Sequence, residues 1–304
     1  MSAFEAFLEG TVRTATPLAF AALGETVAER AGIINIGLEG AIIAGAFGGF
    51  VAAGIGGIWF GFAGAAFSGM AIALIFALFA IKLRADQIIT GTAISLLALG
   101  LTTTLYRQLY STAAAAITIP TMGSTRIPVL SSIPAIGLAL FSQPPITYVF
   151  YLLIPAIWAW LYKTHSGLGL RAVGENPEAA IAVGIMADRV QLLAVLFGGV
   201  MGGIAGGILV IAQAGTFTEG MSAGRGFIAI AIVVLGRWHP IGATLAALVF
   251  AGASALQYLF QAMGWALPYQ IFLGLPYILT LLGLAGIAGR VTAPANLGQW
   301  RKQT

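Results

Sequence analysis

Residues 71–81 read Ala-Ile-Ala-Leu-Ile-Phe-Ala-Leu-Phe-Ala-Ile, a run that is apolar at every position. Residues 228–235, Ile-Ala-Ile-Ala-Ile-Val-Val-Leu, are apolar throughout as well. A transmembrane β-strand alternates apolar and polar residues, because one of its faces lines the interior of a barrel. Runs without that alternation favour the α-helix, which satisfies its own backbone hydrogen bonds in lipid. The sequence therefore predicts an all-α membrane protein.

The composition extends this interpretation to the whole chain of 304 residues, which is 59% hydrophobic and 8% charged, with a mean hydropathy of +0.97. A helix crosses a hydrocarbon core of about 30 Å in roughly 20 residues. We expect a single transmembrane domain over residues 1–304, because no long linker or charged low-complexity run divides it. About nine spans (eight to ten) are predicted, near Thr14–Ala28, Ile33–Ala53, Trp59–Ile81, Ile88–Tyr106, Ile146–Tyr162, Val190–Ala212, Phe227–Gly236, Ile241–Gln261 and Gln270–Gly289.

The cations predict the orientation of these spans. If residues 163–189 are cytoplasmic, ten of the 14 Lys and Arg residues lie inside and four, Arg13, Arg107, Arg126 and Arg225, lie outside. This split satisfies the positive-inside rule. We therefore expect a cytoplasmic C-terminus, an outer N-terminus and an external loop over residues 107–145, which are rich in proline. The formal charge of +4 is explained by orientation in lipid, so no nucleic-acid partner is expected.

Catalytic and metal-binding patterns are missing from the sequence. Cysteine is absent, and neither His165 nor His239 has a second histidine or a carboxylate at metal-ligand spacing. No Gly-x-Ser-x-Gly elbow or Gly-x-x-x-x-Gly-Lys-Ser/Thr loop occurs. We expect no metal, no cofactor held by this chain and no enzymatic activity of its own. Any ATP chemistry would belong to a partner.

Residues 167–185 form a polar island between long apolar runs. Asn176 suits a helix cap, Pro177 suits the first helical position, and Glu175 and Glu178 favour the positive end of a helix dipole. A short helix is predicted over Ala179–Ile185. The residues alone leave two interpretations open, a docking helix for a soluble subunit and an ordinary interfacial loop.

Polar residues also gather around the turn between the first two predicted spans. Glu25, Glu29, Asn35 and Glu39 lie there among several glycines, which predicts a broken helix or re-entrant turn. In the alternative, Glu29 marks the membrane interface and Asn35 caps a helix. Asp86 is expected to cap the fourth span. Two glycine series predict close helix approach, namely Gly198, Gly202 and Gly206, and Gly199, Gly203 and Gly207.

Three segments carry a resemblance to a known family: residues 174–185, residues 29–40 (Glu-Arg-Ala-Gly-Ile-Ile-Asn-Ile-Gly-Leu-Glu-Gly) and residues 224–231 (Gly-Arg-Gly-Phe-Ile-Ala-Ile-Ala). Together they resemble the permeases of ABC importers for branched-chain amino acids, simple sugars and nucleosides. The similarity runs from Thr14 to Gly289. Residues 29–40 are most similar to the shorter permease of nucleoside importers, and the early start of the first matching span also favours nucleosides over pentoses.

The resemblance implies a type II ABC importer permease that moves nucleosides by alternating access, in a prokaryotic inner or plasma membrane. It also implies partners: ATPase subunits that use ATP and Mg, a second and longer permease, and an extracytoplasmic substrate-binding protein or lipoprotein. A simple-sugar or branched-chain amino-acid importer and an ion-coupled secondary transporter are the alternatives. The ATPase-coupling residues would be Gly174, Glu175, Asn176, Pro177 and Ala180, and the substrate path would include Asn35, Glu39, Thr90 and Gln213.

Overall fold

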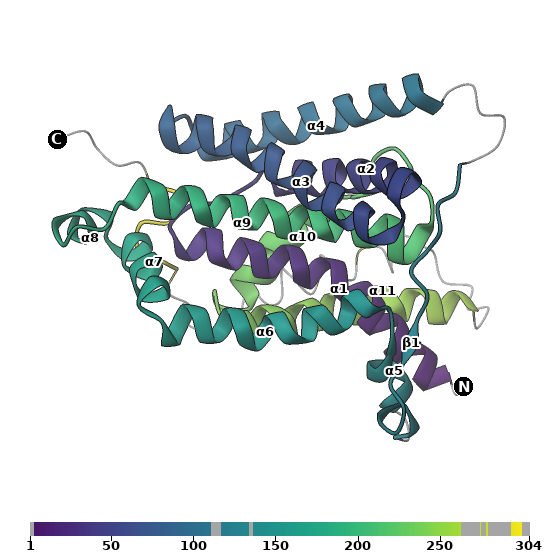
Figure 1. The fold of residues 1–304 in the computed structure, drawn as a ribbon. Helices are drawn as coiled ribbons and strands as arrows, with labels where there is room; N and C mark the ends of the chain where they lie inside the picture. Colours follow the sequence, from purple (N-terminus) through teal and green to yellow (C-terminus); the bar gives the residue numbers. More distant parts are fainter. Residues whose placement is uncertain are drawn as a thin grey trace.

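The computed structural model describes residues 3–110, 117–133, 136–262, 274, 278 and 293–299. Helices dominate these residues and confirm the all-α prediction (Figure 1). Two of the helices end in π-helical turns, α3 over Leu78–Lys82 and α9 over Ile208–Ala214. The longer helices are α1 (Ala3–Arg30), α2 (Leu38–Gly56), α3 (Ile58–Ala77), α4 (Gln87–Tyr110), α6 (Pro145–Lys163), α7 (His165–Glu175), α9 (Ala187–Gly207), α10 (Arg225–Leu235) and α11 (Pro240–Ala262).

Eight of the nine predicted spans coincide with helices in the described part of the chain, and the ninth, Gln270–Gly289, lies outside it except for residues 274 and 278. Among the described residues, five segments are long and apolar enough to cross a membrane, namely α2, α3 with its π turn, α4, α6 and α9 with its π turn. The span predicted near Phe227–Gly236 corresponds to α10, a shorter apolar helix. With 11 residues, α10 is about 16 Å long at 1.5 Å per residue, which is half of a hydrocarbon core.

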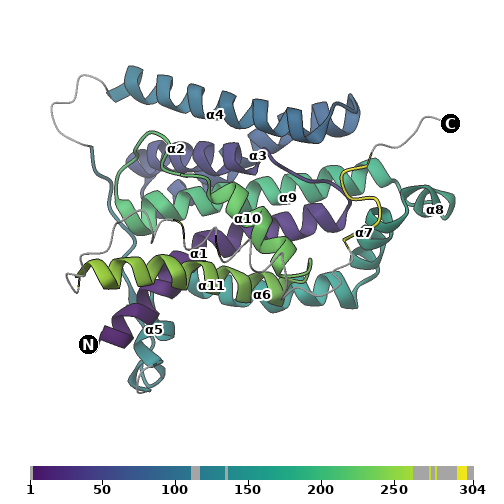
Figure 2. The ribbon, with the colours of Figure 1, turned by 180° about the vertical axis from the view of Figure 1, so that it is seen from behind.

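Helix α1 runs through the middle of the bundle, between α9 on one side and α6 and α11 on the other (Figures 1 and 2). Its side chains from Ala15 to Glu29 are all buried. Many of them are alanines, and small side chains allow neighbouring helices to approach closely in a membrane. Helix α4 lies at one edge of the bundle, where it packs mainly on α2.

The two glycine series of α9 face different helices. A Cβ added at Gly206 would meet the backbone of Ile42 in α2, and one added at Gly203 would meet the backbone of Ala65 in α3. The predicted close approach is therefore confirmed, with α9 wedged between α2 and α3.

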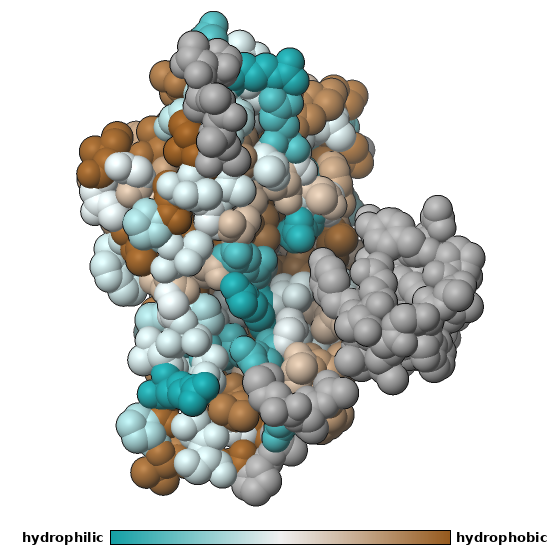
Figure 3. Space-filling view, turned by 90° about the vertical axis from the view of Figure 1, so that its right-hand side faces the viewer, coloured by the Kyte–Doolittle hydropathy of each residue, from teal (hydrophilic) through white to brown (hydrophobic). Residues whose placement is uncertain are grey.

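The bundle has two different ends. At one, which we call the ribbon end, β1 (Thr125–Arg126) pairs antiparallel with β2 (Ser142–Gln143) beside the short α5 (Gly137–Phe141). Hydrophilic residues run down the middle of this end, with hydrophobic ones at its flanks (Figure 3). The opposite end carries α7, α8 (Pro177–Ala182) and residues 293–299, and we call it the α7–α8 end.

Candidate functional site

The connection between α1 and α2 folds back into the bundle. Helix α1 stops at Arg30, and the backbone N–H of Asn35 donates to Glu25 Oε1 at 2.8 Å, before the last turn of α1. Asn35 is 1% exposed. Helical geometry is therefore broken between α1 and α2, as the prediction of a broken helix or re-entrant turn requires. Asn35 does not cap α2, because the residue at that cap is Gly37, which makes no side-chain cap hydrogen bond.

Side chains of α4 satisfy the backbone of this connection. Gln87 Oε1 accepts the N–H of Ile34 at 2.9 Å, and the hydroxyl of Ser95 donates to the carbonyl of Ile36 at 3.2 Å. Asp86 caps α4 as predicted, since its Oδ1 accepts the N–H groups of Ile88 and Ile89 at 2.9 Å each. Backbone groups that are buried without helical hydrogen bonds need such partners, because water cannot reach them there.

Glu39 joins this connection to the half-length helix α10. Residues 215–224 leave the ribbon end, where Arg107 of α4 pairs with Glu219 at 2.7 Å, and cross beside α2 to reach α10 (Figure 2). The Glu39 carboxylate then accepts the N–H of Gly224 at 2.9 Å and the N–H of Gly226 at 2.6 Å. A carboxylate is well placed there, because a helix N-terminus carries free donors and a partial positive charge.

A cavity of about 320 Å³ lies beside Glu39, between α2, α4 and α10. Its size falls within the range of small-molecule sites, about 300–1,000 Å³. Its walls combine aliphatic side chains with hydroxyl groups, one carboxylate and one aromatic ring. The lining residues are Glu39, Ile43, Thr92, Ser95, Leu96, Leu99, Ser222 and Phe227.

The predicted path residues therefore separate into two groups. Glu39 lines the cavity, whereas Asn35 and Thr90 are buried and are not among the residues that line it. Gln213 lies toward the ribbon end, where its Nε2 donates to the carbonyl of Arg13 at 2.9 Å. The other residues that line the cavity were not predicted. Hydroxyl side chains and Phe227 lie within apolar runs, and no local pattern shows that α2, α4 and α10 bring them together.

The polar island forms two helices, and only the second was predicted. Helix α7 starts where Thr164 Oγ1 accepts the N–H of Gly167 at 3.1 Å. Helix α8 starts where Asn176 Oδ1 accepts the N–H of Ala179 at 2.9 Å, which confirms the predicted cap. It ends at Ala182 rather than Ile185, because Gly184 has a φ of +87° and turns the chain.

The five predicted coupling residues occupy two environments. Gly174, Pro177 and Ala180 are buried, whereas Glu175 and Asn176 are exposed. The outer tip of this region is apolar: Ile181 is 44% exposed, Val183 77% and Met186 56%. Helix α8 thus rests on the bundle through its buried residues and presents apolar side chains outward.

A polar cluster ties α7 to the ends of three other helices. The Arg171 guanidinium lies 4.7 Å from the ring centre of Tyr162 in α6, and Tyr162 accepts a hydrogen bond from Arg30 at 3.3 Å. Arg30 Nε also donates to the carbonyl of Trp238 at 2.7 Å, and the Trp238 indole N–H donates to Glu29. The end of α1 is therefore held to α6, α7 and the α10–α11 turn.

His239 stacks on this cluster, with its ring 5.2 Å from that of Tyr162. Burial, and then the positive charge of Arg30, lower the pKa of His239 from its ordinary value of 6.5. The neutral imidazole is therefore the favoured form beside Arg30. No group of three or more metal-ligating side chains occurs among the residues that the structure describes.

Comparison with known proteins identifies the chain as a permease. The family described as "Branched-chain amino acid transport system / permease component" matches residues 7–284. The guanosine ABC transporter permease protein NupQ of Bacillus subtilis is 38% identical over 95% of this chain and 93% of its own length. The nucleoside ABC transporter permease protein NupC of Lactococcus lactis is 37% identical over 92% and 91%. The putative glucose ABC transporter permease protein TsgC13 of Haloferax volcanii is 38% identical over 88% and 81%. With its family model covering most of its length, this multi-pass membrane protein belongs to the branched-chain amino acid transport system permease family.

Proposed function

We propose that this chain is the permease subunit of an ABC importer for nucleosides. The observation that carries the proposal is the match to two permeases named for guanosine and for nucleosides, at 37–38% identity over more than nine-tenths of each chain. The glucose permease of similar identity makes a sugar importer the second candidate. The resemblance of residues 29–40 to the shorter permeases of nucleoside importers supports the nucleoside.

The permease would carry out no covalent chemistry. ATP and Mg would be used by separate ATPase subunits, and a second, longer permease and an extracytoplasmic binding protein or lipoprotein would complete the importer in a prokaryotic inner or plasma membrane. The α7–α8 end, with residues 163–189 and the C-terminal segment, would be cytoplasmic, and residues 107–145 would be external. In support, residues 293–299 hydrogen-bond to α7, so both belong to one end of the bundle.

We propose that the ATPase docks on α8. Exposed Ile181, Val183 and Met186 form an apolar patch at a tip that projects from the bundle, and such patches are typical of interaction sites. Pro177 and Ala180 would hold the helix on the bundle, and Asn176 would fix where it starts. Gly174 and Glu175, at the end of α7, would contribute to coupling without contacting the ATPase. ATP binding would move this docked unit and shift the permease between outward-facing and inward-facing states.

The substrate path would pass the cavity beside Glu39. Each carboxylate oxygen of Glu39 accepts one N–H and keeps a second lone pair, which suits a ribose hydroxyl. The ring of Phe227 suits stacking with a base. Asn35 and Thr90 would act indirectly, by holding the walls of the path, and Gln213 would act toward its other end.

Uptake of labelled guanosine tests the substrate. Cells would express this chain together with its ATPase, second permease and binding protein, and competitors would be unlabelled nucleosides, ribose, glucose and branched-chain amino acids. We expect competition by nucleosides alone. Competition by glucose or ribose would contradict the nucleoside substrate but leave the importer proposal standing. Uptake that persists without the ATPase would overturn the importer proposal.

A further inference from the structure

Residues 293–299 cross the end of α7 and join it to the α1–α2 connection, a segment that we call the C-terminal clamp (Figure 1). The N–H of Ala295 donates to Glu175 Oε2 at 3.1 Å, and the N–H of Asn296 donates to the carbonyl of Gly174 at 3.0 Å. Two residues further on, the N–H of Gly298 donates to the carbonyl of Gly32 at 3.1 Å. One short segment therefore bonds to both α7 and the connection.

The contact between α7 and the connection is too close for side chains. A Cβ added at Gly174 would meet the carbonyl of Arg30 and come within 3.2 Å of the N–H of Gly32. Gly32 itself has a φ of +90° and faces the clamp, because a Cβ there would lie 3.5 Å from the carbonyl oxygen of Asn296. Backbone thus meets backbone at this junction, which leaves little freedom for the three segments to slide past one another.

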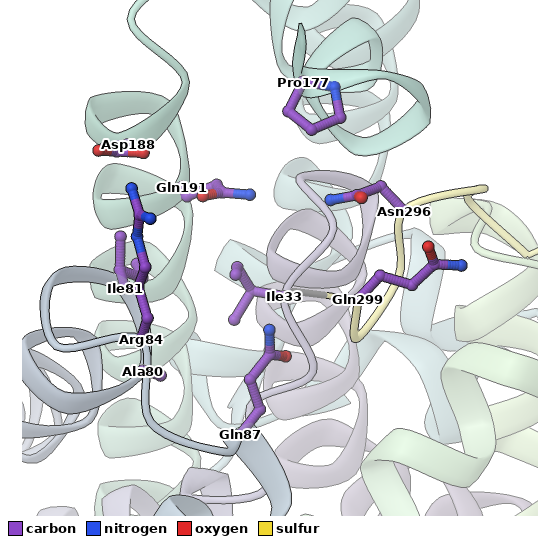
Figure 4. A pocket seen from close by; sticks show the side chains of 10 residues that line it. All are labelled: Ile33, Ala80, Ile81, Arg84, Gln87, Pro177, Asp188, Gln191, Asn296 and Gln299. Atoms are coloured by element: carbon purple, nitrogen blue, oxygen red, sulfur yellow. The ribbon is translucent and has the colours of Figure 1, made fainter. Parts of the chain in front are cut away.

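The other side of the clamp borders a polar crevice of about 40 Å³ (Figure 4). Asn296 and Gln299 line it from the clamp, Pro177 from α8, Ile33 from the connection and Gln87 from α4. Room of this size holds a few water molecules, at about 10–15 Å³ each, and excludes a nucleoside. The clamp therefore lies close to both α8 and the start of α4. The crevice between them is too small to be a substrate site.

We propose that the C-terminal clamp positions α7 and α8 and transmits their movement to the α1–α2 connection. Glu175 is a positioning residue in this account: it acts on the clamp within the permease. A displacement of α8 passes through Gly174 and the clamp to Gly32, and from there along the connection to Glu39 beside the cavity. The inference rests on the proposed docking of the ATPase at α8.

The first test separates docking from transmission. Glu175→Ala removes the acceptor of Ala295, and Glu175→Gln keeps an acceptor oxygen. In the reconstituted full importer, we expect Glu175→Ala to assemble with the ATPase and hydrolyse ATP, while the amount of nucleoside taken up per ATP falls severalfold, because the clamp loses a charge-assisted hydrogen bond. Glu175→Gln should recover most of this ratio. An unchanged ratio in Glu175→Ala overturns the clamp and leaves the docking proposal standing.

The second test reads the clamp without transport. The chain contains no cysteine, so Leu297→Cys introduces a unique thiol at a position that packs against the core. We expect maleimide to label this thiol slowly, and roughly tenfold faster when Glu175→Ala is added, because the clamp then loses one charge-assisted hydrogen bond. The matched control is Glu178→Ala, which removes an exposed carboxylate of α8 and should leave the rate unchanged. Equal rates in all three proteins overturn the clamp.

A third variant separates the two proposals completely. Ile181→Asp places a charge in the exposed patch of α8 and leaves the clamp intact. We expect it to abolish ATPase binding without changing the labelling rate of Leu297→Cys. Intact ATPase binding in this variant would contradict docking at α8. It would also contradict the proposal that the clamp transmits the movement of a docked α8, whatever the labelling rate shows.

Discussion

The start of α8 and the contact of Glu39 with the N-terminus of α10, which we call the Glu39 junction, both depend on polar side chains, but they use them over different distances along the chain. At the start of α8, Asn176 accepts from a backbone group three residues away. At the Glu39 junction, Glu39 accepts from backbone groups 185 and 187 residues away, and at the end of α1 Glu29 likewise accepts from an indole 209 residues away. A local cap stabilises one helix, whereas the distant bonds decide how helices are placed inside the membrane.

The largest effect is expected at Glu39. Glu39→Ala would leave the N–H groups of Gly224 and Gly226 without their acceptor, at about 1.5–3 kcal/mol for each hydrogen bond to a charged group. We expect a lower thermal unfolding temperature in detergent and loss of uptake. Glu39→Gln, which keeps one acceptor oxygen, should fall in between. If Glu39→Ala unfolds at the parental temperature, the bonds from Gly224 and Gly226 to Glu39 do not stabilise the fold, which contradicts the role assigned to distant hydrogen bonds.

Trp238 tests the second distant bond. Trp238→Phe keeps an aromatic ring and removes the N–H that donates to the buried Glu29. Loss of a partner for a buried polar group costs about 1–3 kcal/mol, so the unfolding temperature should fall by less than in Glu39→Ala. Trp158→Phe, at a half-buried indole of α6 beside Lys163, shows the effect of losing an indole that has no hydrogen bond to Glu29. Equal shifts in both variants would assign the effect to ring size instead of the hydrogen bond.

The local cap should matter less for global stability. Asn176→Ala removes an exposed helix cap worth about 1 kcal/mol. We expect an unchanged unfolding temperature but weaker ATPase binding, because only α8 loses its start. Asn176→Ser supplies another capping oxygen and should restore binding. A large drop in unfolding temperature for Asn176→Ala would erase the difference between the two regions.

The smallest effect concerns pH. Because the pKa of His239 lies below its ordinary 6.5 in the folded chain, the unfolded chain binds more protons as the pH falls below that value. Stability should therefore decrease from pH 7 to pH 5, and His239→Phe should flatten this part of the curve. The measurement is the unfolding temperature at each pH, and identical slopes in the two proteins would contradict the placement of His239 beside Arg30.

The difference between local and distant hydrogen bonds also explains which features could be predicted from the sequence. The caps at Asp86 and Asn176 were predictable, because donor and acceptor lie within three residues of each other. Apolar runs predicted where the helices lie, and spaced glycines predicted the close packing of α9. The partners of Glu39 were not predictable, since no local pattern indicates which distant N–H groups a carboxylate will meet.

Two features of the helices depend on contacts that the sequence does not reveal. The span predicted near Phe227–Gly236 is the short helix α10, whose N-terminal backbone is bonded to the distant Glu39. Helix α7 was missed because Gly167, Gly169 and Gly174 weaken helix propensity. Gly167 and Gly174 are required by close backbone contacts with α6 and the end of α1, and such contacts appear only in three dimensions.

ATP-driven guanosine uptake by proteoliposomes tests the central claim most directly. The complete importer would be reconstituted with the parental chain or with Ile181→Asp, and ATP would be supplied on the α7–α8 side. The account predicts guanosine accumulation that requires ATP, is competed by other nucleosides and disappears in Ile181→Asp. Accumulation without ATP, or equal accumulation by Ile181→Asp, would contradict it.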